Sequence, residues 1–325
     1  MEKIKWGVLG TAGIAKDCTI PGMLQAGNCE LYGLAGRSEE KIRIFQDKFH
    51  FQKTYLNYED LLEESEIQAV YIPLPNHLHY YWVMKAIEAG KHVLCEKPLA
   101  PTEEQARELF EAAEKKGVIL MEAFAYLHTP YIAALKHEVE SKSIGEVCYV
   151  ETAFLTSSYN NQNIRMQKNC FGGATYDLGC YCTSMILSIL GKMPEKVLAV
   201  AEFSEDGIDL MTACIMQFGN GVRASFNCGM NFEKEMYRRF DRLYIHGSRG
   251  YIKSSVEYNQ EGKLSYIVCV DGKEEIKSID VLHNYRLEIE NLGQCILENE
   301  KPKVSKDFSV SNARVIDLVL KSIGY

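Results

Sequence analysis

The feature that most constrains the fold is an alternation of short apolar runs with helix-like segments through the first part of the chain. The apolar runs lie at residues 4–9, 31–35, 69–72, 92–95 and 118–121. Such alternation is typical of parallel strands joined by helices that cover both faces of a sheet. It predicts an N-terminal α/β domain with a doubly wound parallel sheet.

The helices between these runs have recognisable ends. Thr102-Glu-Glu-Gln105 forms a capping box, and the apolar face that follows stops at Gly117, a residue that accepts positive φ. A second helix is expected from about residue 76 to 89, closing at Gly90. These signals fix the helix ends within the predicted sheet.

After residue 124 the chain changes to longer runs of alternating apolar and polar residues, separated by turn signals such as Phe218-Gly-Asn-Gly. We expect a helix at 131–141 and strands at 147–154, 196–203, 210–218, 222–228, 242–246 and 264–270. This pattern predicts a C-terminal α+β domain with a large, mostly antiparallel, open sheet that has one face free for a partner. The predicted division is a dinucleotide-binding domain at 1–123 and a substrate-binding and oligomerisation domain at 124–325.

The first apolar run leads directly into Gly10-Thr-Ala-Gly-Ile-Ala15. Against the dinucleotide fingerprint G-x-G-x-x-G/A, Gly10 takes the first position, Ala12 the second and Ala15 the third. We expect Gly13 to supply the backbone freedom that Ala12 lacks. The predicted cofactor-binding residues of this loop are Gly10, Thr11, Ala12, Gly13, Ile14 and Ala15. The alternative is a strand, turn and helix that bind no ligand.

The second run ends in Ala35-Gly-Arg-Ser38, without the carboxylate that would hold the ribose 2′-hydroxyl of NAD. Arg37 and Ser38 instead suit a 2′-phosphate, since the guanidinium offers fork-like donors and a planar face. They favour NADP over NAD as cofactor. The alternatives are a solvated Arg37 and a Ser38 that only caps the next helix.

Charge and hydropathy exclude several classes of partner. The 325 residues have a net charge of −8, and the lysines and arginines form neither a stripe nor a tail. We therefore expect no nucleic-acid or membrane partner. The first residues show no apolar signal core, and no window reaches the roughly 18 apolar residues of a membrane span. The predicted location is cytoplasmic.

Eleven cysteines are present, an odd number without a Cys-x-x-Cys pair. Cys170, Cys180 and Cys182 lie closest to a metal-ligand spacing, but no fourth ligand is evident beside them. We predict reduced thiols and no metal. A metal-binding structural protein built on these three cysteines is the alternative.

Three further stretches have a distinctive order. They are Ala69-Val-Tyr-Ile-Pro-Leu-Pro-Asn-His-Leu-His-Tyr-Tyr-Trp82, Glu96-Lys-Pro98 and Gly172-Gly-Ala-Thr-Tyr-Asp-Leu-Gly-Cys-Tyr-Cys182. Together with Gly10-x-x-Gly13, they resemble the Gfo/Idh/MocA family of NAD(P)-dependent sugar and polyol oxidoreductases, and the resemblance covers essentially the whole chain. Tyrosine at 181, where many members have histidine, resembles the branch of dihydrodiol dehydrogenase, NADP-dependent D-xylose dehydrogenase and glucose-fructose oxidoreductase.

The resemblance implies roles for individual residues. Lys97 matches the lysine of the Glu-Lys-Pro motif, while Asp177 and Tyr181 match the family's Asp-x-Gly-x-His/Tyr motif; these three are the predicted catalytic residues. The remaining cofactor-binding residues that we carry over or place beside them are Leu74, Pro75, Asn76, His79, Glu96, Lys97 and Arg165. The predicted substrate-binding residues are Lys97, Tyr126, Asp177 and Tyr181.

The chemistry of these side chains agrees with the resemblance. Oxidation of an alcohol by nicotinamide requires that a proton leave the oxygen. A tyrosine can accept that proton if an ammonium lowers its pKa from about 10, and Lys97 can provide the ammonium. The alternatives are a buried aromatic role for Tyr181 and a helix cap for Asp177.

The sequence thus predicts an NAD(P)-dependent dehydrogenase or reductase that acts on a CH–OH group of a sugar, polyol or trans-diol. It is expected to form a homodimer or homotetramer through the C-terminal sheet. One alternative is an enzyme that retains its nucleotide and couples two sugars. Another is a regulator that binds NADPH without turnover.

Overall fold

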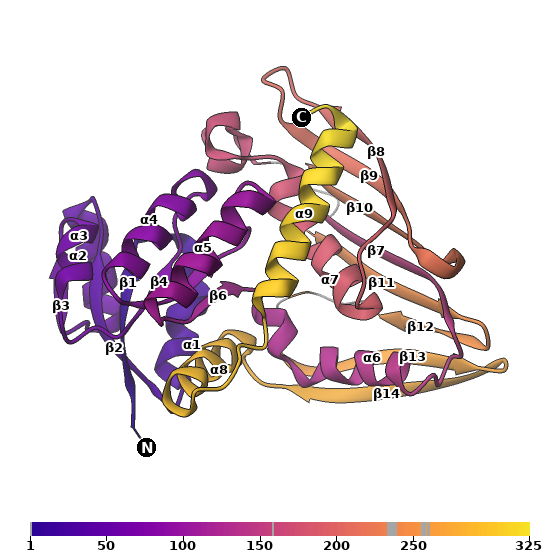
Figure 1. The fold of residues 1–325 in the computed structure, drawn as a ribbon, viewed down its shortest axis with the longest axis horizontal. Helices are drawn as coiled ribbons and strands as arrows, with labels where there is room; N and C mark the ends of the chain where they lie inside the picture. The colour runs from indigo at the N-terminus through magenta and orange to yellow at the C-terminus, as the bar shows by residue number, and fades with distance from the viewer. Residues whose placement is uncertain (1, 158, 233–238, 255–257, 259–260) are drawn as a thin grey trace. The chain divides into compact units, whose positions relative to one another are not determined.

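The computed structural model describes residues 2–157, 159–232, 239–254, 258 and 261–325 (Figure 1). The chain divides into two compact units. One contains Met1–Thr129 and Leu282–Ser309, and the other contains Pro130–Val281 and Val310–Tyr325. The sequence-based division placed residues 282–309 in the second domain, whereas in the structure they belong to the first compact unit. The reason is that helix α8 (Asn284–Glu298) packs on α1 (Ile20–Gln25).

Six parallel strands form the sheet of the first unit, in the order β3-β2-β1-β4-β5-β6. Their bounds are β1 Ile4–Leu9, β2 Cys29–Ala35, β3 Lys53–Tyr55, β4 Ala69–Ile72, β5 His92–Glu96 and β6 Leu120–Ala123. Because β1 pairs with both β2 and β4, the strand order reverses at β1. Ligands of open parallel sheets bind beyond the carboxyl ends of the strands at such a reversal. The predicted doubly wound sheet is confirmed.

The helices of the first unit lie on both faces of this sheet (Figure 1). The chain moves outward from β1 to β3 in one direction and from β4 to β6 in the other, and right-handed crossovers in opposite directions pack on opposite faces. Besides α1 and α8 they are α2 Glu39–Phe49, α3 Tyr58–Glu63, α4 Asn76–Glu88 and α5 Glu103–Lys116. Thr102 caps α5 as predicted, since its hydroxyl accepts the Gln105 N–H at 3.2 Å. The helix ends at Gly117, whose φ is 74°. Covered on both faces, all four residues of β4 are buried.

Eight strands form the sheet of the second unit, in the order β14-β13-β12-β11-β7-β10-β9-β8. Their bounds are β7 Val147–Ser157, β8 Lys196–Phe203, β9 Asp209–Gln217, β10 Arg223–Phe232, β11 Arg239–Gly247, β12 Gly250–Ser254, β13 Gly262–Val270 and β14 Lys273–Val281. Neighbouring strands are antiparallel except β7 and β10, which pair in parallel. The predicted, mostly antiparallel sheet is confirmed.

Helices cover one face of this second sheet (Figure 1). Helix α6 (Pro130–Glu140) contacts β14, and α7 (Cys180–Leu190) contacts β7 and β10. Helix α9 (Lys306–Ile323) begins in the first unit and ends in the second. The short helical turns are η1 Ala15–Thr19, η2 Ala125–His128, η3 Ile164–Met166, η4 Lys168–Cys170, η5 Thr175–Gly179 and η6 Gly219–Gly221. Within the described part of the chain, no helix is long and apolar enough to cross a membrane.

Candidate active site

The glycine loop after β1 has the conformation that a dinucleotide fingerprint requires. Gly10 has φ of 130°, and a Cβ there would lie 3.0 Å from Leu74 Cδ2, so no other residue fits without strain. Gly13 is exposed and helical without positive φ, and only the Asp17 carboxylate comes within 4.0 Å of a Cβ built on it. The unusual backbone therefore belongs to Gly10, while Gly13 contributes open space. These features fit a pyrophosphate at this turn.

The residues that follow this loop begin their helix with a wide turn. Residues Ala15–Thr19 form the π-helical segment η1 before α1 starts. In the second unit, η5 (Thr175–Gly179) is π-helical in the same way ahead of α7. Such wide turns are frequent at functional sites. Both of the sequence-predicted motifs, the glycine loop and the segment with Asp177, therefore start their helices with the same local irregularity.

Arg37 and Ser38 lie at the carboxyl end of β2. Ser38 caps α2, because its hydroxyl accepts the Lys41 N–H at 3.4 Å. Arg37 is exposed, and its guanidinium lies beside the Tyr58 hydroxyl, where it opposes the rise that burial causes in the pKa of Tyr58. The preference for NADP over NAD that Arg37 and Ser38 suggest stays a prediction.

His79 connects two of the predicted loops. Its fully buried ring places Nδ1 2.8 Å from the Pro98 carbonyl oxygen and Nε2 2.7 Å from the Leu74 carbonyl oxygen. Burial lowers the pKa of His79, and the two carbonyl acceptors partly oppose this. The ring thus joins the turn after β4, which contains Pro75 and Asn76, to the turn after β5.

Lys97 follows directly on the end of β5. It is half-buried and is joined to Pro98 by a cis peptide bond. The preceding residue, Glu96, accepts a hydrogen bond from the Tyr71 hydroxyl at 2.6 Å, and that hydroxyl accepts one from Thr19 at 2.9 Å. Burial and the Glu96 charge raise the pKa of Tyr71. Glu96 is therefore anchored to the sheet and to η1, which holds the start of the Lys97 turn.

In the second unit, Asp177 and Arg165 form an ion pair. Arg165 Nε donates to Asp177 Oδ2 at 2.7 Å, and the guanidinium lies 5.1 Å from the centre of the Tyr159 ring. Asp177 and Tyr181 both act on the electrostatics of Arg165 and raise its pKa. Three predicted residues, Arg165, Asp177 and Tyr181, are thus gathered in one place. Asp177 lies inside η5 rather than at a capping position, so the helix-cap alternative does not describe it.

The ring of Tyr181 is part of an aromatic cluster. Its centre lies 5.4 Å from that of Phe154 and 5.1 Å from that of Tyr258. Tyr258 in turn shares a hydrogen bond of 2.8 Å with Thr152. This packing fixes the ring and leaves both interpretations of Tyr181 open. Tyr126, the further predicted substrate residue, is buried beside Phe124 in the first unit.

The double glycine before Asp177 is explained by a carboxylate that the sequence did not reveal. Asp209, at the start of β9, accepts the Thr175 N–H and the Thr175 hydroxyl, each at 2.7 Å, and the Thr212 hydroxyl at 3.0 Å. Gly173 has φ of 113°, and a Cβ there would lie 2.0 Å from Asp209 Oδ1. A Cβ at Gly172 would lie 2.4 Å from the Arg165 carbonyl oxygen. Both glycines therefore permit close packing around the start of η5.

Asp209 is almost fully buried, and burial raises its pKa to about 6 despite its three donors. Thr212 is three positions away, but Thr175, which donates two of the three hydrogen bonds, lies 34 positions away, so the sequence neighbourhood of Asp209 does not indicate this role. Only the two glycines and Thr175 give a signal, and a pair of glycines ahead of a helix has several possible explanations. Asp209 is the main residue near the predicted site that sequence reasoning missed.

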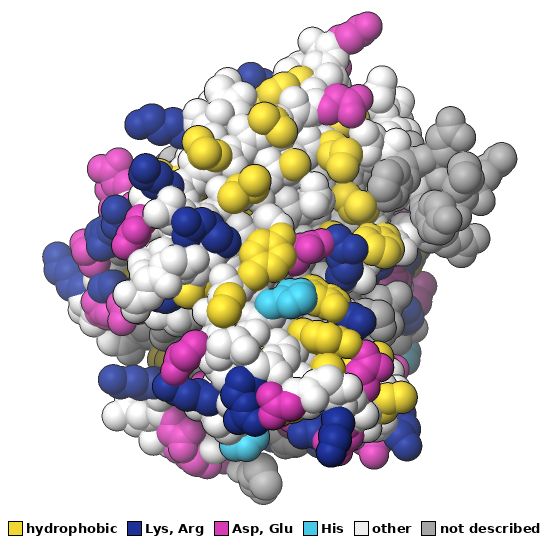
Figure 2. All heavy atoms as spheres, turned by 90° about the vertical axis from the view of Figure 1, so that its right-hand side faces the viewer, with side chains coloured by type: hydrophobic (Ala, Val, Ile, Leu, Met, Phe, Trp, Pro, Cys, Tyr) yellow, Lys and Arg dark blue, Asp and Glu magenta, His cyan; other side chains and the backbone are white. Residues whose placement is uncertain are grey.

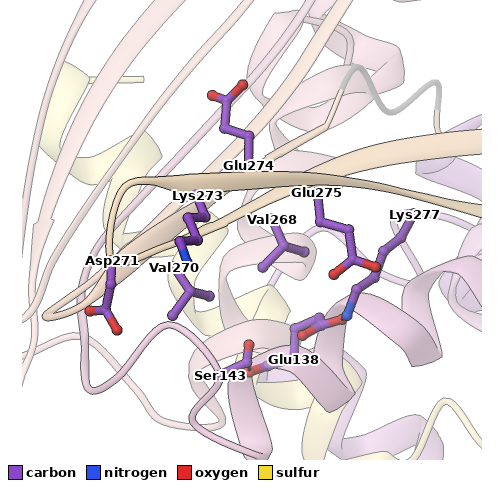
Figure 3. Close-up of a pocket in the computed structure, with 9 residues that line it drawn as sticks. All are labelled: Glu138, Ser143, Val268, Val270, Asp271, Lys273, Glu274, Glu275 and Lys277. Atoms are coloured by element: carbon purple, nitrogen blue, oxygen red, sulfur yellow. Dashed lines mark hydrogen bonds and ion pairs between the residues drawn. The ribbon is translucent and has the colours of Figure 1, made fainter.

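A hollow of about 410 Å³ lies elsewhere in the second unit, between α6 and the β13–β14 hairpin (Figure 3). Its lining is Glu138, Ser143, Val268, Val270, Asp271, Lys273, Glu274, Glu275 and Lys277. Figure 3 shows Lys277 reaching toward Glu138, to which it donates at 2.6 Å. The lining contains none of the predicted site residues, and its charges of both signs partly neutralise one another. The candidate active site remains with the motifs described above.

Comparison with known proteins identifies the two units separately. The family model described as "Oxidoreductase family, NAD-binding Rossmann fold" matches residues 4–124, and that of the "GFO/IDH/MocA C-terminal domain" matches residues 132–253. The chain belongs to the Gfo/Idh/MocA family. It is an NAD(P)-dependent oxidoreductase, as the motifs predicted.

Relatives in this Gfo/Idh/MocA family match along nearly the full chain. The chain is 31% identical to D-xylose 1-dehydrogenase (NADP(+)) 2 of Haloferax volcanii, over 98% of this chain and 96% of that one. It is 30% identical to trans-1,2-dihydrobenzene-1,2-diol dehydrogenase of Xenopus laevis, over 98% of each. The 3-ketoreductase KijD10 of Actinomadura kijaniata, solved with NADP and TDP-benzene, has a TM-score of 0.93 at 27% identity, over 99% of this chain and 98% of that one. The predicted branch is confirmed.

The three cysteines with a metal-like spacing, Cys170, Cys180 and Cys182, are buried. Among the residues that the structure describes, no three His, Cys, Asp or Glu side chains gather as a metal site would require. Burial raises the pKa of the Cys182 thiol, so it behaves as a small apolar core residue.

Proposed function

We propose that this protein is an NADP-preferring dehydrogenase or reductase whose substrate is a sugar, a polyol or a vicinal diol. The observation that carries the proposal is the cluster of Arg165, Asp177 and Tyr181 on and beside η5, the segment that matches the family's catalytic motif. The names of the relatives support the substrate class, since they act on a pentose, a cyclic diol and a deoxysugar nucleotide.

The residues present fit a dinucleotide. Gly10 supplies the backbone turn and Gly13 the open space for the pyrophosphate. Arg37 would hold the 2′-phosphate with its fork of donors. The turns after β4 and β5, joined by His79, would lie against the nicotinamide half. A bound nicotinamide supplies the hydride chemistry.

The chain's own part in the reaction is to handle one proton. When a substrate hydroxyl is oxidised, its proton passes to the Tyr181 oxygen, and in the reductive direction Tyr181 returns it. The Lys97 ammonium donates a hydrogen bond to the reacting oxygen and stabilises the negative charge that develops there. The Arg165–Asp177 ion pair orients a neighbouring hydroxyl of the substrate.

Two substitutions test this division of roles. In Lys97→Ala and Tyr181→Phe, NADPH should still bind, while turnover falls by at least ~100-fold, as expected for groups that handle the proton. Tyr176→Phe is the matched control, because Tyr176 is a buried tyrosine of the same segment whose ring packs against Phe171 and Tyr325. Turnover is measured on a panel of aldoses, inositols, ketones and vicinal diols with NAD and NADP in parallel.

The outcomes of this panel also separate the alternatives. Wild-type rates in both variants would remove the mechanism. Tight NADPH binding without turnover on any substrate would favour a regulator. Nucleotide that co-purifies and reduces a second sugar would favour an enzyme that retains its cofactor. A clear preference for NAD would show that the interpretation of Arg37 and Ser38 was wrong.

We further propose that the protein is cytoplasmic and self-associates through the open face of the second sheet. Figure 2 shows apolar side chains gathered on this side of the molecule, with charged side chains around them. On β8 and β9, Leu198, Val200 and Ile215 are 70%, 72% and 61% exposed, and Leu198 pairs with Ile215 across the strands. A contiguous apolar patch on a sheet face is typical of a subunit interface.

Sedimentation equilibrium tests the association. Leu198→Lys should shift the protein toward smaller species, because it places a charge within the apolar patch. Ile44→Lys is the control, since Ile44 is also exposed but lies on α2 of the first unit. A monomeric wild-type protein, or equal effects of the two changes, would exclude this interface.

A further inference from the structure

A buried carboxyl group lies directly behind the turn that contains Lys97. Glu122 is on β6, where it is paired in register with Cys95 of β5 and is 2% exposed. Its Oε1 accepts a hydrogen bond from the Leu99 backbone N–H at 2.8 Å. Leu99 is two residues after Lys97, so this bond fixes the end of the turn that Glu96 anchors at its start.

The other oxygen of this carboxyl group is not matched in the same way. Oε2 is buried and has no hydrogen-bond partner among the described residues, although the Ser309 hydroxyl is close enough to favour the ionised form. A buried carboxylate with an unmatched oxygen is costly. Burial therefore raises the pKa of Glu122 to about 7, against the opposing effects of Ser309, the Leu99 N–H and Lys97.

The groups that face Glu122 come from three elements. From β5 they are Glu96, which further raises the pKa of Glu122, and the buried Cys95 thiol, whose own pKa is raised by burial. The turn after β5 contributes the Lys97 ammonium, and α9 contributes the uncharged Ser309. Lys97 is the cation in this set, so a change of charge on Glu122 is felt by Lys97 as the gain or loss of a counter-charge.

We propose that Glu122 is a positioning residue whose ionised carboxylate holds in place both the Lys97 ammonium and the backbone that follows it. The consequence for catalysis rests on the role proposed above for Lys97. With Glu122 ionised, Lys97 stays protonated to higher pH, and the hydrogen bond to Leu99 is charge-assisted and stronger. With Glu122 neutral, both effects weaken together.

Nuclear magnetic resonance on the full-length protein tests this without turnover. The amide of Leu99 should shift with an inflection near pH 7, because its proton is bound to the titrating carboxyl group. In protein with ¹³Cε-labelled lysine, the signal that disappears in Lys97→Ala belongs to Lys97. In Glu122→Gln, that signal should titrate about 1 pH unit lower, and the Leu99 inflection should be lost.

Two further variants separate charge from position. Glu122→Asp keeps the charge but shortens the reach to Leu99, so it should preserve most of the Lys97 titration and weaken the Leu99 inflection. Glu288→Gln is the control, since Glu288 is a second buried carboxyl group of the same unit, near Glu96, whose oxygens have no hydrogen-bond partner within the described chain. It should keep the Leu99 inflection and the Lys97 titration.

An unchanged Lys97 titration in folded Glu122→Gln would overturn the proposal. If that variant does not fold, a wild-type Leu99 amide without an inflection near pH 7 would overturn it. Retained turnover in Lys97→Ala would overturn the proposed function instead, whereas the Leu99 and Lys97 titrations measured in the wild type and in Glu122→Gln do not depend on that result. On a competent substrate, the alkaline limb of kcat/KM should move with the Lys97 titration by the same amount.

Discussion

Each unit contains one buried carboxylate that fixes the segment bearing a predicted catalytic residue, and the two carboxylates are built differently. In the first unit Glu122 binds one backbone N–H, that of Leu99. In the second unit Asp209 binds the Thr175 N–H and the hydroxyls of Thr175 and Thr212. Both hold the backbone two residues from the side chain in question, Lys97 in one case and Asp177 in the other.

The two sites differ in how strongly they stabilise the ionised form of the carboxyl group. Three donors at Asp209 resist the effect of burial, and the pKa of this group rises only to about 6. Glu122 has one donor of normal geometry, and its pKa rises to about 7. Asp209 is thus ionised at neutral pH and acts as a fixed structural tie. Glu122 is close to half-ionised there, which makes it the carboxylate that can respond to pH.

Removing the two carboxylates should reveal this difference most strongly. Asp209→Ala leaves the buried Thr175 N–H and one threonine hydroxyl without an acceptor, since the Thr175 and Thr212 hydroxyls lie 3.1 Å apart and one can donate to the other. At roughly 1–3 kcal/mol for each unmatched group, we expect a loss of about 4 kcal/mol of unfolding free energy. Glu122→Ala leaves one N–H unmatched, so we expect about 2 kcal/mol. Urea unfolding at pH 7 followed by circular dichroism measures both.

Equal losses in the two variants would show that the number of donors does not determine the stability. The matched control is Glu288→Ala, which removes a buried carboxyl group without removing a hydrogen bond between described residues. Its unfolding free energy should change less than that of Asp209→Ala, because it leaves no donor unmatched.

Much of the fold was predictable because it depends on local patterns. Strands β1 and β4 begin and end where their apolar runs do, and α5 begins at its capping threonine and ends at its glycine. The strands β3, β12 and β14 were not predicted. β14 (Lys273–Val281) is exposed along most of its length, and its charged residues give no apolar alternation. The register with β13 is what makes it a strand.

The site was predictable only as far as its motifs extend. Lys97, Asp177 and Tyr181 stand in recognisable stretches, whereas Asp209 and the Arg165–Asp177 pair arise from tertiary contacts that no local spacing encodes. Glu122 was visible in the sequence only as a carboxylate at the end of β6. Its bond to Leu99 depends on the pairing of β5 with β6 and on the turn between them. Long-range hydrogen bonds therefore account for most of what was missed.

The dependence of stability on pH gives the finest separation of the two carboxylates. A carboxyl group with a raised pKa in the folded state keeps its proton when the unfolded chain has lost it, so stability falls as pH rises from the unfolded to the folded pKa. For Asp209 that window closes at about pH 6, and for Glu122 it extends to about pH 7. Burial lowers the pKa values of His79 and His128 in the folded state. These two groups therefore make stability rise with pH, and their contribution stops changing near the unfolded histidine pKa of about 6.5.

Subtracting the wild-type unfolding free energy from that of a variant at each pH cancels the contributions of the titrating groups that both proteins contain. The unfolding free energy of Glu122→Gln minus that of the wild type should still rise by about 1 kcal/mol between pH 6 and 7, since one unit of pKa shift corresponds to about 1.4 kcal/mol. For Asp209→Asn, the same difference should level off by about pH 6. Unfolding in urea at half-unit steps of pH measures both curves. If the two curves levelled off at the same pH, the two carboxyl groups would titrate alike. A change in the charge of Glu122 near pH 7 that acts on Lys97 would then be excluded.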